Sequence, residues 1–272
     1  MTSYSRAFPE PVAAKVPEIT LMFWVVKLLT TGAGEATSDY LALGSHVVGA
    51  AIEGGLLVIG LLWQFRIRRY SAVAYWFLAY AIACLGTGVS DTLHLTVGLP
   101  YAATTLLWAV VLAGVFITWY RSERTLSIHS ILTRRREMFY WATVFTTFAL
   151  GTALGDFTAT TLGLGYLSSV GLFAVAIVVP AIAWRLGLNA IAAFWWAYVL
   201  TRPLGASLAD YFVKPPSLSG FGFGDSRTAV VSTVAVAILV AYLAITRNGI
   251  QQPVGQAAPG HRPAQHARRA VR

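Results

Sequence analysis

The sequence predicts an all-α polytopic membrane protein in which eight transmembrane helices form four parallel two-helix repeats around a pseudo-symmetry axis along the membrane normal. Composition is one reason. Hydrophobic residues make up 57% of the 272-residue chain and charged residues only 11%, whereas soluble domains carry about 25% charged residues. The other reasons are a motif that occurs four times and a one-sided distribution of basic residues. Together they exclude an ordinary soluble domain.

Eight windows of the chain are long and apolar enough to cross about 30 Å of hydrocarbon. They lie at about 19–41, 45–65, 72–93, 100–120, 138–158, 163–185, 189–212 and 227–246. The first window is the expected insertion signal, because residues 1–18 lack the pattern of a cleaved signal peptide. Pro180 and Pro203 predict kinks in the sixth and seventh windows, since each removes an intrahelical hydrogen bond. The eighth window is rich in Val, Ala, Leu and Ile, which favours exposure to lipid.

These windows form one membrane domain over about residues 17–250, with a cytoplasmic segment at 1–16. The repeats cover about 17–69, 70–124, 134–186 and 188–247. We expect a disordered basic cytoplasmic tail at 251–272, because its polar composition cannot bury apolar surface.

The repeated motif is an aromatic residue and a Trp, then a Gly ten residues after the Trp and an Asp five residues after the Gly. Its copies contain Trp24, Gly34 and Asp39; Trp76, Gly86 and Asp91; Trp141, Gly151 and Asp156; and Trp195, Gly205 and Asp210. We expect the Trp residues at the headgroup boundary and the Gly residues where helices approach closely. The polar residues of the first helix, from Lys27 to Asp39, form one stripe that must face protein. The first helix of each repeat should therefore surround the axis, with the second exposed to lipid.

Basic residues indicate the orientation. Most Lys and Arg lie near the termini and in the loops that join repeats, whereas the opposite loops contain only Lys214 and Arg227. By the positive-inside rule, both termini and the joining loops are cytoplasmic. The net charge of +9 then reflects topology and contact with anionic headgroups at the cytoplasmic face, and no nucleic-acid partner is needed. The pattern is compatible with a homo-oligomer.

Three segments resemble a known family: 15–20, 127–137 and 147–156. The family consists of bacterial integral membrane proteins with four tandem two-helix units, each called a repeat of unknown function. The resemblance covers about residues 15–246 and implies the eight-helix architecture and a multi-pass location in the bacterial cytoplasmic (inner) membrane. It brings no established activity.

The four Asp residues are the main candidate site. Each lies near the C-terminal, outer end of its helix, where the helix dipole disfavours negative charge, so capping does not explain them. We expect Asp39, Asp91, Asp156 and Asp210, with Glu35 and His94, to bind a cation. Carboxylates with an imidazole suit divalent transition ions, so a divalent metal ion is a candidate substrate, and no cofactor is identified. Structural hydrogen bonding of the Asp residues remains the alternative.

Charges near the bilayer centre predict buried pairs or an ion path. Lys27 and Arg202 are positive and Glu35 and Glu53 negative, and unpaired charges at this depth cost about 2.5–3.5 kcal/mol each. Repeat 4 has Ala206 where repeat 1 has Glu35, so the copies should not contribute equally.

These features favour a small-cation transporter or channel, for divalent metal ions or coupled to protons, that uses the Asp ring. The alternative is a non-transporting membrane subunit or sensor that recruits a partner through its basic cytoplasmic loops. An intramembrane enzyme is not expected, because Ser38 and Ser90 lack a neighbouring base. Cys84 is the single cysteine, so no internal disulfide is possible.

Overall fold

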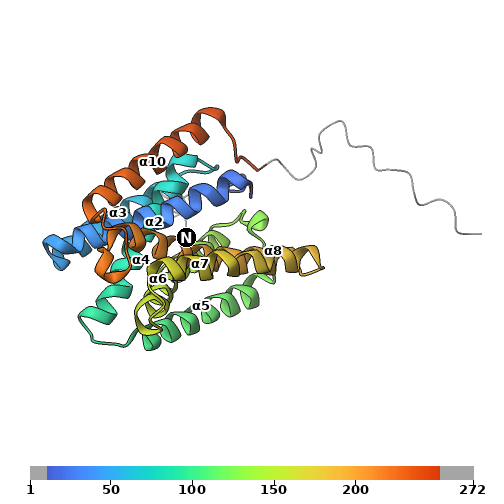
Figure 1. Cartoon of the computed structure of the whole chain (residues 1–272). Helices are drawn as coiled ribbons and strands as arrows, with labels where there is room; N and C mark the ends of the chain where they lie inside the picture. The colour runs from blue at the N-terminus through green and yellow to red at the C-terminus, as the bar shows by residue number, and fades with distance from the viewer. Residues whose placement is uncertain (1–10, 252–272) are drawn as a thin grey trace, which may run out of the picture.

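The computed structural model describes residues 11–251, which form helices without strands (Figure 1). The predicted basic tail and residues 1–10 of the N-terminal segment lie outside the described residues. The α-helices are α2 (Leu21–Gly44), α3 (His46–Arg66), α4 (Ala72–Leu95), α5 (Tyr101–Glu123), α6 (Arg134–Asp156), α7 (Tyr166–Ala176), α8 (Val178–Arg185), α9 (Ala190–Val213) and α10 (Asp225–Thr246). Short helices are η1 (Ile128–Ser130), η2 (Phe157–Thr161), which continues α6, and η3 (Pro216–Leu218). Each predicted window coincides with a helix, and the sixth corresponds to α7 and α8 together.

Within residues 11–251, six helices are long and apolar enough to cross a membrane. They are α3, α4, α5, α6 with η2, α7 with α8, and α10. These spans are consistent with a multi-pass membrane protein. Helices α2 and α9 fall outside this set, and they carry the central charges Lys27, Glu35 and Arg202.

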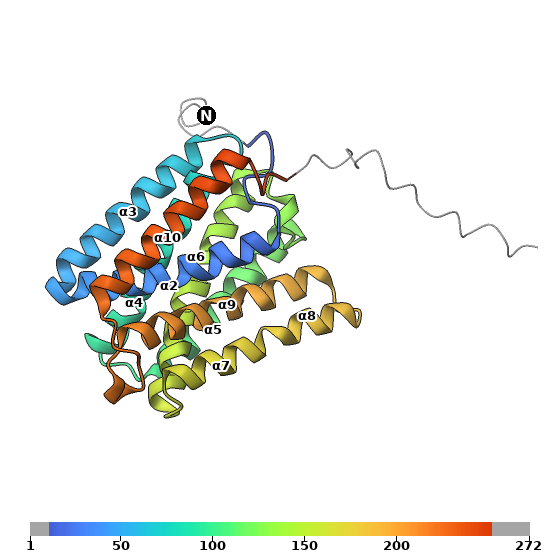
Figure 2. The ribbon, with the colours of Figure 1, turned by 45° about the horizontal axis from the view of Figure 1, so that its top comes forward.

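The first helices of the repeats form a closed inner ring. In cyclic order, α2 packs on α4, α4 on α6, α6 on α9 and α9 on α2. Each outer helix packs mainly against the inner helix of the following repeat: α3 on α4, α5 on α6, α7 and α8 on α9, and α10 back on α2 (Figures 1 and 2). The predicted division holds, because 67% of the α4 span is buried but only 17% of the α3 span.

The motif glycines make this ring tight. Each lies against the residue seven positions after the Trp in the next inner helix: Gly34 against Ala83, Gly86 against Phe148, Gly151 against Arg202 and Gly205 against Thr31. A Cβ on Gly34 would lie 2.2 Å from the Cβ of Ala83. The predicted role of these glycines in close helix approach is confirmed.

The motif aromatics form a second closed layer, near the N-terminal ends of the inner helices. Each Trp contacts the aromatic residue that precedes the Trp of the previous repeat: Trp76 contacts Phe23, Trp141 contacts Tyr75, Trp195 contacts Tyr140 and Trp24 contacts Phe194. Trp76, Trp141 and Trp195 are buried. These three side chains therefore fill the contacts between repeats and do not face lipid, and their depth relative to the headgroups stays a prediction.

The same end of the bundle is tied by a buried polar cluster. Lys15, which precedes α2, forms an ion pair of 2.8 Å with Glu137 of α6 and donates to the carbonyl of Gln64 at the end of α3. The amide of Gln64 also donates to Glu137. This cluster connects the N-terminal segment to two repeats.

Only one of the two predicted proline effects breaks a helix. Pro180 lies four residues after Ala176, where α7 ends, so the missing N–H coincides with the break between α7 and α8. Helix α9 continues through Pro203.

The close contact between Gly34 of α2 and Ala83 of α4 can be tested by substitution. Gly34→Ala should lower the free energy of unfolding by about 1–3 kcal/mol, because Ala83 is rigid and cannot move away. The matched control is Gly54→Ala in α3, where nothing lies within 4 Å of the new Cβ. Thermal melting in detergent measures both, and equal melting temperatures for the two variants would contradict the tight ring.

Candidate functional site

The guanidinium of Arg202 lies at the centre of the inner ring, fully buried. Its Nε donates to the carbonyl of Phe148 in α6 at 3.1 Å, and its Nη1 to the carbonyl of Thr31 in α2 at 3.0 Å. Nη2 also lies 3.5 Å from the carbonyl of Ala83 in α4. One side chain from α9 therefore bonds to the backbones of the other three inner helices, at the repeat-equivalent positions.

Glu35 neutralises this guanidinium. The Glu35 Oε2 lies 2.9 Å from Arg202 Nη2, and both side chains are buried. The hydroxyls of Thr87 and Thr152 accept from Nη2, at 2.6 and 3.1 Å, and donate to the same Oε2, at 2.8 and 3.0 Å. These positions are equivalent in repeats 1, 2 and 3, while repeat 4 has Ala206. The predicted pairing of Arg202 with Glu35 is confirmed, as is the unequal contribution of the repeats.

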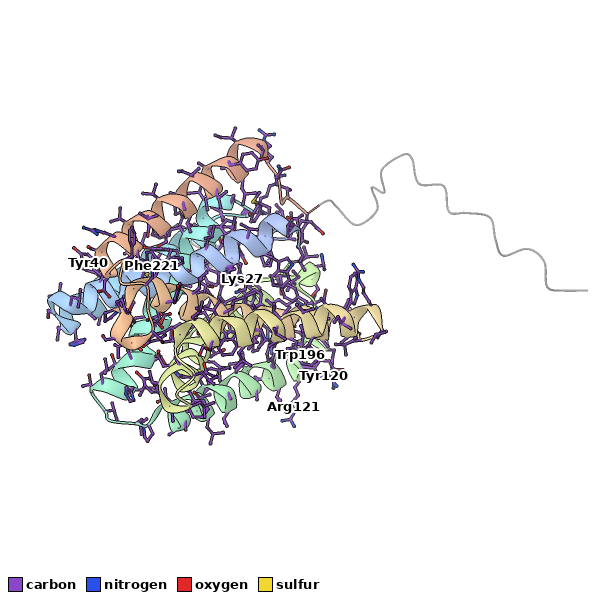
Figure 3. All side chains as sticks on the ribbon, in the orientation of Figure 1. Lys27, Tyr40, Tyr120, Arg121, Trp196 and Phe221 are labelled. Atoms are coloured by element: carbon purple, nitrogen blue, oxygen red, sulfur yellow. The ribbon has the colours of Figure 1, made fainter. Side chains whose placement is uncertain are left out.

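Lys27 is buried but does not pair with either glutamate. Its Nζ lies 3.5 Å from the ring centre of Tyr198 and 5.1 Å from that of Phe148, and it has no hydrogen-bond partner among the described residues. Aromatic faces attract cations, which explains how the side chain is accommodated. Figure 3 shows Lys27 within the bundle, whereas Tyr120 and Arg121 lie at its periphery. The prediction that Lys27 neutralises Glu35 or Glu53 is wrong.

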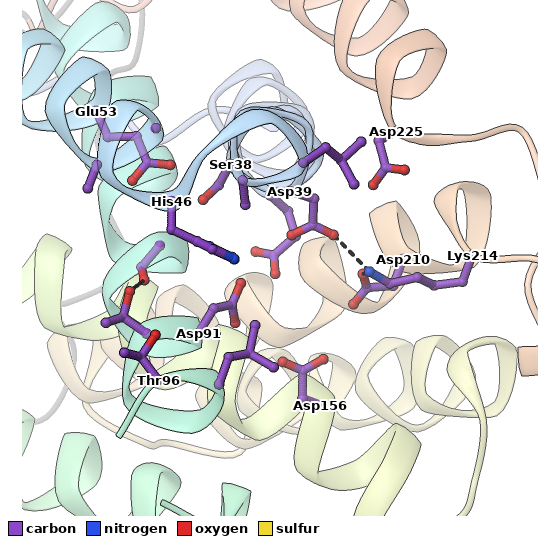
Figure 4. Close-up of a pocket in the computed structure, with 18 of the residues that line it drawn as sticks. Ser38, Asp39, His46, Glu53, Asp91, Thr96, Asp156, Asp210, Lys214 and Asp225 are labelled. Atoms are coloured by element: carbon purple, nitrogen blue, oxygen red, sulfur yellow. Dashed lines mark hydrogen bonds and ion pairs between the residues drawn. The ribbon is translucent and has the colours of Figure 1, made fainter. Parts of the chain in front are cut away.

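An acidic chamber of about 390 Å³ lies between Arg202 and the C-terminal ends of the inner helices. Its lining includes seven carboxylates: Glu35, Asp39, Glu53, Asp91, Asp156, Asp210 and Asp225 (Figure 4). Lys214 is the only Lys or Arg among the lining residues. The chamber therefore combines high negative charge with a single fixed cation.

Lys214 bridges two Asp residues of the ring. It follows α9, and its Nζ lies 2.9 Å from Asp39 of α2 and 3.6 Å from Asp210 of α9 (Figure 4). Burial alone would lower the pKa of Lys214, but the Asp210 and Asp39 carboxylates outweigh burial and raise it above its usual range. The ammonium therefore remains charged, and it neutralises part of the ring.

Glu53 reaches the chamber from an outer helix. The side chain extends from α3 to α4, where a Cβ on Gly88 would lie 2.3 Å from Glu53 Oε2. Glu53 is 3% exposed and forms no ion pair with any described residue. The predicted pair of Glu53 with Lys27 or Arg202 is wrong, because Glu53 faces the chamber and those cations lie deeper in the ring.

The structure brings together five of the six residues predicted to bind a cation: Glu35, Asp39, Asp91, Asp156 and Asp210. His94 is the exception. Its ring stacks on Tyr101 at 3.6 Å, and its Nδ1 lies 2.8 Å from the carbonyl of Leu99. His46 lines the chamber in its place. Within residues 11–251, no group of three or more His, Cys, Asp or Glu is arranged to hold a metal ion.

The lining also includes residues that the sequence did not assign to the site, among them Tyr101, Tyr166, Lys214 and Asp225. For Lys214 a signal existed. It is one of two Lys or Arg residues in the loops that follow the inner helices, and it lies four residues after Asp210. No comparable signal marked the two tyrosines, because their place in the chamber depends on how the outer helices pack.

A family model for a "Repeat of Unknown Function (DUF347)" matches residues 22–70, 74–125, 139–186 and 193–248. The chain belongs to this DUF347 repeat family. Each match spans one inner helix and the outer helix that follows it. The predicted membership and the four tandem units are confirmed. No curated protein and no solved structure matches the chain.

The buried pair in this DUF347 protein gives a prediction with an internal control. Glu35→Gln should lower the free energy of unfolding by about 3–5 kcal/mol, because it leaves the Arg202 charge buried without a counter-charge. Lys27→Met should melt at or above the parent temperature, since Lys27 has no carboxylate partner to strand. Thermal melting in detergent compares them. If Lys27→Met were the more damaging change, Arg202 and Glu35 would not be the main tie.

Proposed function

We propose that this protein is a transporter for a small cation, which binds in the acidic chamber. The observation that carries the proposal is the charge of the lining, where seven carboxylates face one lysine. Like charges held so close are tolerable only when a cation or protons neutralise them. A site of this kind concentrates cations from solution.

The proposal includes the full membrane topology. Eight helices cross the membrane, with α2 and α9 shielded from lipid by the outer helices, and the four repeats are related by an axis along the membrane normal. The basic residues of the loops that join repeats support a topology in which the N-terminal ends of the inner helices, and both chain termini, lie in the cytoplasm of a bacterium. The acidic chamber then lies toward the outer face of the cytoplasmic membrane.

The layers below the chamber favour a gated transporter over an open channel. A cation that leaves the chamber along the ring axis meets the buried Arg202, then Lys27, then the aromatic layer. Two unit charges 4 Å apart repel by about 4 kcal/mol at an effective dielectric constant of 20. Passage therefore requires the inner helices to rearrange around these fixed charges, as in alternating access.

A second candidate is a non-transporting sensor or membrane subunit that binds a cation outside and recruits a partner inside. The closed axis also suits this function, because a chamber that ends at Arg202 needs no exit. The surface proposed to recruit a partner is the basic region around the loop between α5 and α6. Glu123 pairs with Arg135 at 3.4 Å and with Arg136 at 2.8 Å, so part of the basic charge is already neutralised. The exposed Arg121 and Arg124 would then meet anionic headgroups or an acidic partner.

Cation binding tests both candidates. In detergent, a cation present at 100 times its dissociation constant should stabilise the protein by about 2.7 kcal/mol. Asp91→Asn and Asp156→Asn should reduce this stabilisation, because both carboxylates line the chamber and neither forms an ion pair with a described residue. Glu18→Gln is the matched control, since it removes a carboxylate that does not line the chamber. The panel comprises divalent metal ions, alkali ions, protons and ammonium ions.

Measurement of cation flux across a membrane distinguishes the transporter from the non-transporting sensor. The transporter should move the bound cation into proteoliposomes, and Asp91→Asn should slow this movement. Binding without flux in either direction, with and without a pH gradient, would reject transport and leave the sensor. If no cation of the panel changes the melting temperature, the chamber is structural and both proposals fail.

A further inference from the structure

Lys214 provides an observed example of the chemistry that the acidic chamber accepts. Its primary ammonium lies between Asp210 and Asp39, the ring carboxylates of two adjacent inner helices, at 3.6 and 2.9 Å. An ammonium ion donates three hydrogen bonds, and charge-assisted bonds of this type are strong. The ring can therefore hold a primary ammonium at the contact between two neighbouring helices.

The opposite side of the ring has the same carboxylates without a lysine. Asp91 and Asp156 come from α4 and α6, which are adjacent in the ring, as α9 and α2 are. The positions equivalent to Lys214 in the other repeats are Leu43, Leu95 and Thr160. Neither Asp91 nor Asp156 forms an ion pair with a described residue. This pair lacks the internal cation that its counterpart has.

Glu53 points independently to a bound cation. It is 3% exposed, lies in the wall of the chamber and has no cationic partner among the described residues (Figure 4). Glu53 accepts a hydrogen bond from Ser38, but this bond brings no counter-charge. A buried carboxylate is normally paired with a cation, protonated or bound to a ligand. Glu53 packs against Gly88 of α4 on one side and lines the chamber on the other, so a ligand can approach it only from the chamber.

Size and lining favour an organic cation over a bare metal ion. The cavity of about 390 Å³ is more than ten times larger than a water molecule's share of liquid volume, about 30 Å³. Its walls include apolar and aromatic side chains between the carboxylates: Ala42, Leu43, Ala50, Leu95, Tyr101 and Tyr166. The described residues contain no cluster arranged to hold a metal ion. Carbon chains suit such walls, and ammonium groups suit such carboxylates.

We propose that the acidic chamber binds a primary aliphatic amine or diamine, with one ammonium group between Asp91 and Asp156 in the manner of Lys214 between Asp210 and Asp39. This deepens the proposed function and rests on it, because it names the class of cation that the same chamber takes. Lys214 then acts as an internal competitor, whose charge lowers the affinity of the chamber for any second cation.

The experiment is isothermal titration of the full-length protein in detergent at constant ionic strength and pH 7. The probes are 1,4-diaminobutane, n-butylamine, tetramethylammonium, magnesium chloride and manganese chloride. The diamine should bind more tightly than the monoamine, and both more tightly than tetramethylammonium, which has no N–H to donate. The double variant Asp91→Asn/Asp156→Asn should weaken diamine binding by about 10- to 100-fold, since charge-assisted hydrogen bonds are lost.

A second pair of variants tests the internal competitor without touching Asp91 or Asp156. Lys214→Gln should strengthen diamine binding by about tenfold, because it frees Asp39 and Asp210 and removes a like charge. Arg227→Gln is the matched control, since it removes the same charge from an exposed position that does not line the chamber. It should leave the affinity unchanged. This arm remains informative if the double variant does not fold.

The outcomes separate this inference from the proposed function. Amine binding that the double variant weakens and Lys214→Gln strengthens supports the inference. Metal ions that bind through the Asp residues while amines do not would overturn it and leave cation transport standing. Amine binding that is indifferent to both Asp91→Asn/Asp156→Asn and Lys214→Gln would also overturn it. A protein that binds none of the probes would overturn the amine site, and the alkali ions and protons of the melting panel would then decide whether the chamber binds any cation.

Discussion

The buried ion pair between Arg202 and Glu35 is the constraint on which the inner ring depends. A guanidinium is too costly to bury unless its charge and its N–H groups are satisfied. Here the satisfying groups come from all the other inner helices, three of them backbone carbonyls. The helices must therefore lie at a fixed distance and register, and the motif glycines make that distance short. The need to neutralise the Arg202 charge therefore specifies how the four inner helices pack together.

Each level of the ring uses equivalent positions for a different purpose. Near the N-terminal ends, the aromatic pairs contact their neighbours in sequence around the ring. At mid-depth, the same relation brings each glycine against the next helix. At the C-terminal ends, the Asp residues converge on a cavity in place of packed side chains. One repeated unit therefore builds an aromatic layer at the N-terminal ends of the inner helices, a charged centre at mid-depth and a cavity at the C-terminal ends.

Much of this architecture could be predicted from the sequence, because hydrophobic length and repeat spacing are local properties. The helix positions, the inner and outer sets and the grouping of the Asp residues follow from them. Pairing of the central charges could not be predicted fully. On a helical wheel Lys27 and Glu35 share a stripe, but their heights differ, and only packing decides that Lys27 meets the ring of Tyr198. The prediction that His94 joins the Asp residues failed for a similar reason. Its ring stacks on Tyr101 of the next helix, a contact that depends on packing.

The placement of Arg202 and Glu35 in different repeats has an evolutionary consequence. In an assembly of four identical two-helix subunits, every subunit would carry the same residue at each axial position. An arginine at the Arg202 position would then be present four times in one layer, and a glutamate at the Glu35 position four times in another, and burial makes such like-charge layers costly. Joining the units in one chain allowed each copy to diverge, so that one supplies the cation, another the carboxylate and two the hydroxyls. A homotetramer of identical single repeats could not reproduce this centre, because it could not place one guanidinium, one carboxylate and two hydroxyls around a single axis.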